Sequence, residues 1–81
     1  MVARSTESLA GQPVGRPLTV VDFDLPVDVH QRLLELGLTK GTRCVVVRYA
    51  PLGDPLQIKV RGYALSLRGS EARGILVHPQ A

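Results

Sequence analysis

Hydrophobic and polar residues alternate most regularly in the segment 56–67, LQIKVRGYALSL. If Arg61 and Gly62 form a two-residue turn, three apolar pairs face one another on one side of the resulting hairpin. Those pairs are Leu56 with Leu67, Ile58 with Leu65, and Val60 with Tyr63. The other side pairs Gln57 with Ser66 and Lys59 with Ala64. Since a shift of one residue would expose the whole apolar set, the pattern predicts a hairpin in this register.

Two further segments have the composition of strands. Residues 18–24 (LTVVDFD) are rich in β-forming residues and predict a half-buried strand. We expect Thr19, Val21 and Phe23 on one side of it, and Val20, Asp22 and Asp24 on the other. Residues 42–50 (TRCVVVRYA) are apolar at successive positions, which predicts a strand covered on both faces.

A helix of about two and a half turns is predicted in PVDVHQRLLELG, residues 26–37, from the spacing of its apolar residues. Val29, Leu33 and Leu36 form its apolar stripe. We expect Asp28 to cap its start, with Gln31 completing a capping box. Gly37 would end it, with Leu38 closing back on the last turn. Residues 70–73 (SEAR) predict a turn of helix capped by Ser70, followed by a final strand GILVH over 74–78.

The elements predict a mainly β fold: an SH3-like, five-stranded, partly open barrel with one inserted helix and a short helical turn before the last strand. Its core must be Val, Leu and Ile, because aromatic residues make up 4% of the chain and Trp is absent. We expect a flexible tail over 1–8, a single domain over 9–78 and a short tail over 79–81. With one Cys and no apolar run of ~20 residues, the sequence favours a cytoplasmic protein.

The net charge of +3 is concentrated near the C-terminus. Residues 1–54 are neutral overall, whereas residues 55–81 carry four basic side chains and one acidic side chain. These are Lys59, Arg61, Arg68 and Arg73 against Glu71. The excess is explained either by a solvated face or by an anionic partner such as an acidic protein surface, nucleic acid or lipid headgroups.

Groups able to do chemistry are scarce. Cys44 lies mid-strand among valines and is expected to be a small buried hydrophobe. His30 and His78 have no second ligand at metal-binding spacing, and no catalytic pairing or phosphate-binding glycine loop is present. We therefore expect no catalytic residue, no metal site and no cofactor. Tyr63 is assigned to the core face and Tyr49 to the surface, which leaves few aromatic platforms for single-stranded nucleic acid.

The segment APLGDP, residues 50–55, allows two interpretations. As a simple turn, Pro51 fixes φ, Gly53 permits a positive φ and Pro55 starts the next strand, with Leu52 folded over the core edge. As a contact loop, the same rigidity would present side chains to a partner. The candidate partner-binding residues are Leu52, Gly53, Asp54, Lys59, Arg61 and Arg68. A competing surface is the outer face of the helix, with His30, Gln31 and Glu35.

The stretches RLLELGLTKGT (32–42) and APLGDPLQIKVRGYALSLRGSEARGILV (50–77) resemble the FeoA family of bacterial ferrous iron transport. The matching positions are Arg32, Leu33, Leu36, Gly37, Leu38, Gly41, Thr42, Ala50, Pro51, Leu52, Gly53, Asp54, Pro55, Gly62, Leu65, Leu67, Arg68, Glu71, Ala72 and Val77. The resemblance covers about Leu9 to Val77, and the LGDP loop is its most specific part.

The resemblance implies an SH3-like barrel and a non-enzymatic role beside FeoB, a membrane transporter whose cytoplasmic part carries a GTP-binding domain. It also implies a place at the inner face of the plasma membrane through that partner. The module is similar to the C-terminal domain of metal-dependent repressors as well, but 81 residues leave no room for their other domains. Two alternatives stay open: a nucleic-acid binder using the basic C-terminal hairpin, and a metal-responsive regulator. Homo-oligomers are compatible with the exposed strand edges of a small barrel.

Overall fold

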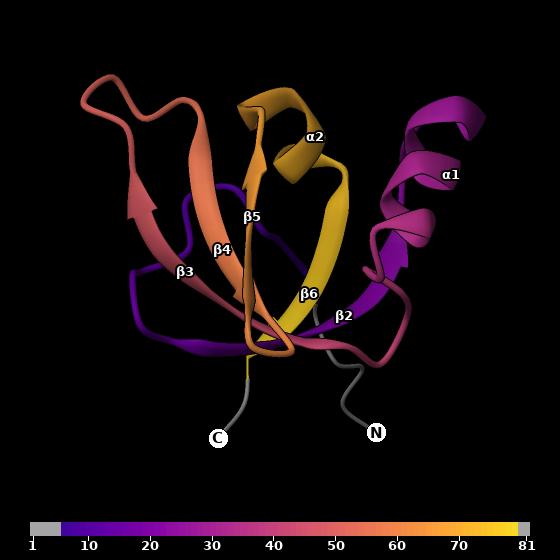
Figure 1. The fold of residues 1–81 in the computed structure, drawn as a ribbon, viewed down its shortest axis with the longest axis horizontal. Coiled ribbons are helices and arrows are strands. Elements are labelled where there is room, and N and C mark those ends of the chain that lie inside the picture. The colour runs from indigo at the N-terminus through magenta and orange to yellow at the C-terminus, as the bar shows by residue number, and fades with distance from the viewer. Residues whose placement is uncertain (1–5, 80–81) are drawn as a thin grey trace.

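The computed structural model describes residues 6–79, which form one antiparallel sheet and two helices (Figure 1). In chain order the elements are β1 (Glu7–Ser8), β2 (Pro17–Phe23), α1 (Val27–Glu35), β3 (Arg43–Tyr49), β4 (Leu56–Val60), β5 (Tyr63–Leu67), α2 (Gly69–Arg73) and β6 (Ile75–Pro79). The six strands follow the order β1-β6-β2-β3-β4-β5, and the sheet curls into the predicted partly open, SH3-like barrel. The sixth strand, beyond the five predicted, is the two-residue β1, which pairs with β6.

The barrel encloses an aliphatic core, as predicted. Its buried members are Leu9, Leu18, Val20, Leu33, Leu38, Cys44, Val46, Leu56, Ile58, Val60, Leu67, Ala72, Ile75 and Val77. All of the strands except the two-residue β1 contribute to this cluster, and so do both helices. Aliphatic packing is therefore what holds the helices against the sheet.

The hairpin of β4 and β5 has the predicted register at every position, from Leu56 opposite Leu67 to Val60 opposite Tyr63. The turn residues Arg61 and Gly62 have φ values of 49° and 87°. Two successive positive φ values are typical of a type I′ turn, whose twist matches that of the flanking strands. Alternating burial and a two-residue turn are therefore enough to fix this part of the fold.

The assignment of faces in β2 is wrong. Leu18 and Val20 are fully buried, whereas Thr19 and Val21 are only half-buried. The pairing of β2 with β6 shifts between Val20 and Asp22, so that an extra residue is accommodated in β2. Such a β-bulge reverses the alternation beyond it, which brings Phe23 back against the core. The predicted faces hold only for the part of the strand beyond the bulge.

β3 is covered on one face, not on two as predicted. Cys44 and Val46 are buried, while Val47 is 42% exposed. Figure 1 shows α1 beside β2, on the other side of the molecule from β3. The outer face of β3 is therefore an open surface of β-branched residues.

The two ends of α1 differ in how well the sequence predicts them. At its start the N-cap is Pro26 and no side chain caps the helix, so the capping box of Asp28 and Gln31 does not form. Asp28 lies inside the first turn instead, where its charge favours the helix dipole. At its end Gly37 has φ 94°, and Leu38 N donates to Leu33 O, as the predicted glycine-terminated helix requires.

The N-terminal boundary also differs from the expectation of a tail over 1–8. Glu7 and Ser8 form β1, paired with Val77 and Leu76 of β6. Pro79, assigned to the second tail, is the last residue of β6. Residues 1–5 and 80–81 lie outside the described residues.

Candidate functional site

The connection between β3 and β4, residues 50–55, is built as a closed turn. Gly53 N donates to Ala50 O at 2.7 Å, and Ala50 N donates to Pro55 O at 2.9 Å. Gly53 has φ 85°, a value that a side chain would strain, and the Asp54–Pro55 peptide is cis. The predicted turn chemistry of this segment is confirmed, and its backbone is held by its own hydrogen bonds.

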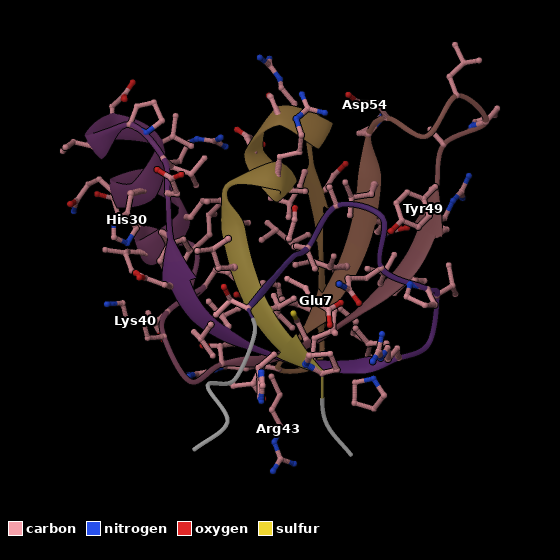
Figure 2. All side chains as sticks on the ribbon, turned by 180° about the vertical axis from the view of Figure 1, so that it is seen from behind. Glu7, His30, Lys40, Arg43, Tyr49 and Asp54 are labelled. Carbon is pink, nitrogen blue, oxygen red and sulfur yellow. The ribbon has the colours of Figure 1, made fainter. Side chains whose placement is uncertain are left out.

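Asp54 fastens this loop to α2. Its Oδ1 accepts a hydrogen bond of 3.0 Å from Gly69 N, the first amide of the helix. A methyl group on Gly69 would lie 2.8 Å from the other carboxylate oxygen, so the helix and the Asp54 side chain are in close contact here. Figure 2 shows Asp54 at the end of the molecule where α2 lies. Asp54 is therefore a tether inside the protein as well as an exposed residue.

Glu71 connects α2 to the rest of this end. One carboxylate oxygen accepts from Arg68 N at 3.0 Å, and the other pairs with Arg32 of α1. The N-cap of α2 is Arg68, so the prediction that Ser70 caps this helix is wrong by two positions. Loop, α2 and α1 are thus joined by side-chain contacts at one end of the barrel, which we call the loop end: residues 50–55, α2 and the face of α1 that carries Arg32.

The exposure of Leu52 bears on one part of the simple-turn interpretation. Its side chain is 96% exposed, the highest value among the large hydrophobic residues described. It does not fold over the core edge, as the simple-turn account expects. The loop is therefore a hydrogen-bonded turn that holds an apolar side chain in solvent.

The six candidate residues divide between the two ends of the barrel. Leu52, Gly53, Asp54 and Arg68 lie at the loop end, whereas Lys59 and Arg61 lie toward the β4–β5 turn (Figure 1). Lys59 stands opposite Ala64, and Arg68 lies four residues beyond Ala64, about 13 Å along the strand. The basic residues Lys59, Arg61 and Arg68 are therefore spread along the hairpin and do not form one compact cluster.

A cleft that the sequence did not reveal lies between α1 and the β5–α2 corner. It has a volume of about 550 Å³. Its lining residues are Val29, Arg32, Pro55, Ser66, Leu67, Arg68 and Glu71. No local sequence pattern predicts this cleft, because the curl of the sheet is what brings the edge strand β5 close to α1.

The remaining reactive groups are structural. Cys44 is buried, and burial raises the pKa of its thiol to about 11. His30 stacks on Phe23 with ring centroids 4.3 Å apart, and His78 pairs with Thr19 across the β2–β6 ladder. Within residues 6–79, no three His, Cys, Asp or Glu side chains lie close enough to hold a metal ion together.

The two tyrosines exchange the roles predicted for them. Tyr49 is half-buried and its hydroxyl donates to Gln12 O. Tyr63 is 39% exposed beside the turn of the hairpin, and its hydroxyl donates to Leu36 O at the end of α1. Tyr63 thus links β5 to α1.

Comparison with known proteins gives one family. The FeoA domain family matches residues 8–79. A fusion of Fe(2+) transport protein A with the Fe(2+) transporter FeoB, from Porphyromonas gingivalis, is 40% identical over 48 residues, which are 59% of this chain. The chain spans only 6% of the length of that fusion protein.

Solved structures agree on the fold. The FeoA protein from Chlorobium tepidum superimposes with a TM-score of 0.86 at 38% identity, covering 91% of this chain and 70% of the other. The FeoA of Stenotrophomonas maltophilia, described as an SH3 domain protein complexed with zinc, gives a TM-score of 0.69 at 32% identity and covers 86% and 87% of the two chains. No helix described between residues 6 and 79 is long and apolar enough to cross a bilayer.

Proposed function

Because the chain belongs to the FeoA family of ferrous iron transport, we propose that it is a non-enzymatic cytoplasmic accessory protein that binds the cytoplasmic region of the transporter FeoB and tunes iron uptake. The observation that carries this proposal is the similarity to one part of a fused transport protein A and FeoB. Fusion keeps two modules at a high effective concentration, which is useful where they act on each other. Where the module and the transporter are separate chains, the same contact needs a binding surface on the module.

The loop end is the surface we assign to this contact. Leu52 offers an apolar anchor, and the hydrogen bonds of the turn and of Asp54 hold that anchor in place before binding. A preformed loop loses little conformational entropy on docking, so more of the contact energy appears as affinity. Arg68 lines the cleft together with Pro55 of the same loop and adds a positive charge there. Lys59 and Arg61 lie nearer the β4–β5 turn, outside the loop end.

A binding assay between the purified chain and full-length FeoB in membranes or detergent, under reducing conditions, tests the proposal. We expect Leu52→Asp to weaken binding at least about tenfold, since a central apolar anchor contributes more than 1.4 kcal/mol. The stability of the variant should be unchanged, because the side chain makes no buried contact. Thermal unfolding of both proteins checks this.

Two exposed valines are compared with Leu52. Val14→Asp, on the segment before β2, should leave affinity unchanged. Val27→Asp, at the start of α1, examines the competing helix surface. If Val27→Asp weakens binding and Leu52→Asp does not, the docking surface is the helix. If the unaltered chain shows no association with FeoB, the proposed function itself is wrong.

A further inference from the structure

One edge of the sheet is left open. β5 is the last strand in the sheet order and pairs only with β4. The opposite edge is β1, which is two residues long and therefore offers little backbone to a partner. β5 has five residues, of which only Leu67 is buried. A flat strand with an unpaired side is a template for a further strand.

The register of the hairpin identifies the free backbone groups. In a two-residue type I′ turn, the residues that flank the turn, Val60 and Tyr63, form a hydrogen-bonded pair. Pairs then alternate, so Lys59–Ala64 and Gln57–Ser66 are the non-hydrogen-bonded ones. The amide and carbonyl groups of Ala64 and Ser66 consequently point away from β4. Among the described residues, no other segment donates to them or accepts from them.

The open edge borders the cleft between β5 and α1. Ser66 and Leu67 line one side of the cleft and Val29 and Arg32 line the other. α1 is held beside the edge by one contact near each end of β5. Tyr63 donates to Leu36 O at one end, and Arg32 pairs with Glu71 at the other. The two elements that border the cleft are therefore tied to each other on both sides of it.

The side chains around the cleft favour a ligand that carries both apolar and acidic groups. Val29, Pro55 and Leu67 provide apolar surface. Arg68 has no carboxylate partner among residues 6–79, and Arg32 keeps 51% of its side chain exposed while it pairs with Glu71. Side chains of an added strand point alternately to its two faces. Apolar residues on one face and carboxylates on the other would satisfy both kinds of surface.

We propose that the β5 edge binds an extended, acidic segment of a partner protein by strand addition, with backbone hydrogen bonds to Ala64 and Ser66 and with Arg32 and Arg68 facing its carboxylates. This surface goes beyond the contact assigned to Leu52, and it does not depend on which protein that loop contacts. A second copy of this chain is a poor occupant. Its β5 strand, YALSL, carries no carboxylate that could face Arg32 and Arg68.

The test uses a blocked synthetic peptide in which aspartate and valine alternate. Two-dimensional NMR should show binding at micromolar to millimolar peptide, with slower hydrogen exchange at the amides of Ala64 and Ser66. A second peptide of the same sequence is N-methylated at alternate residues, which removes its backbone donors but keeps every charge. We expect this peptide not to bind, because strand addition depends on those donors.

Two variants of Ser66 distinguish the contribution of its backbone amide to binding from that of its side chain. Ser66→Pro removes the outward amide without removing a bond to β4, so we expect affinity to fall about tenfold. Ser66→Ala keeps that amide and should bind as the unaltered chain does. Arg68→Glu should weaken binding about two- to fivefold, as for an exposed ion pair. Thermal unfolding of each variant confirms that the barrel is retained.

Several results would overturn the proposal. The first is equal binding of the N-methylated peptide, which would show attraction by charge alone. The second is a Ser66→Ala variant that loses as much affinity as Ser66→Pro. Absence of binding at millimolar peptide would also contradict it. Finally, concentration-dependent dimers with protected Ala64 and Ser66 amides would assign the edge to a second copy. None of these outcomes bears on whether FeoB associates with the chain.

Discussion

The connections at the two ends of β4 both reverse the direction of the chain, but they are stabilised in different ways. The turn before β5 has two residues, Arg61 and Gly62, and within residues 6–79 no hydrogen bond or ion pair joins them to a segment outside the hairpin. The loop before β4 has six residues, 50–55, and it is tied to α2 through Asp54. The first is determined by backbone conformation alone. The second depends on a partner fifteen positions away in the chain.

The difference shows where the protein has room for recognition. A type I′ turn joins its strands through two residues, both of which are needed to reverse the chain. Next to it, Cys44 of β3 lies opposite Val60 of β4. In the longer loop, the residues that reverse the chain are different from the residue that faces the solvent. Hydrogen bonds hold its backbone while Leu52 stays in solvent. The hairpin end is thus stabilised by apolar packing, and the loop end by polar contacts between segments.

The packing at the hairpin end can be tested through the buried thiol of Cys44. Its folded pKa is raised from 9.0 to about 11 by burial, so the folded state holds this proton more tightly than the unfolded state. Its stabilising contribution is complete below pH 9 and is lost as the pH rises to about 11. We expect the free energy of unfolding to decrease by roughly 2 kcal/mol over that range. Urea unfolding under reducing conditions measures it.

Other groups also titrate at alkaline pH, so the comparison with Cys44→Ala is essential. That variant leaves a small void and should be less stable below pH 9, where the thiol of the unaltered chain is protonated. It should lack only the part of the alkaline decrease that belongs to the thiol. Parallel curves for the two proteins between pH 9 and 11 would mean that Cys44 is open to solvent in the folded state.

The polar contacts at the loop end are tested by Asp54→Ala. The substitution removes the acceptor for Gly69 N, which resembles the loss of a helix cap, and we expect a destabilisation of about 1 kcal/mol. Asp54→Asn keeps an acceptor oxygen at the same place and should retain most of the stability. Hydrogen exchange should be faster at Gly69 in the alanine variant only. Equal stability of all three proteins would show that the loop is not fastened to α2 by this bond.

The contrast between the two connections also explains what could be predicted from the sequence. The hairpin register follows from alternation and a two-residue turn, so it is correct at each pair. The end of α1 at Gly37 is likewise a local signal. The SH3-like barrel follows from the number and length of such elements. These features depend on residues close together in the chain.

The errors arise where distant residues decide. The bulge in β2 is set by its pairing with β6, and it brings Phe23 to the core side with Val20 and not to the side of Thr19. Glu7 and Ser8 become a strand only because β6 lies beside them. At the site, the loop was found from its composition, but the tether of Asp54 to α2 and the separation of Lys59 from Arg68 need the curled sheet. The cleft beside β5 had no local signal at all.

The smallest expected effect concerns the turn itself. Arg61 has φ 49°, a conformation in which asparagine is less strained than most residues, and Asn-Gly is a preferred pair for type I′ turns. We expect Arg61→Asn to stabilise the protein by about 0.5 kcal/mol, seen as a higher urea midpoint with an unchanged slope. Leu52→Asn is the matched control, since Leu52 is equally free of buried contacts but has no positive φ. It should give no gain. A loss of stability in Arg61→Asn would mean that the arginine side chain, and not the backbone alone, supports the hairpin.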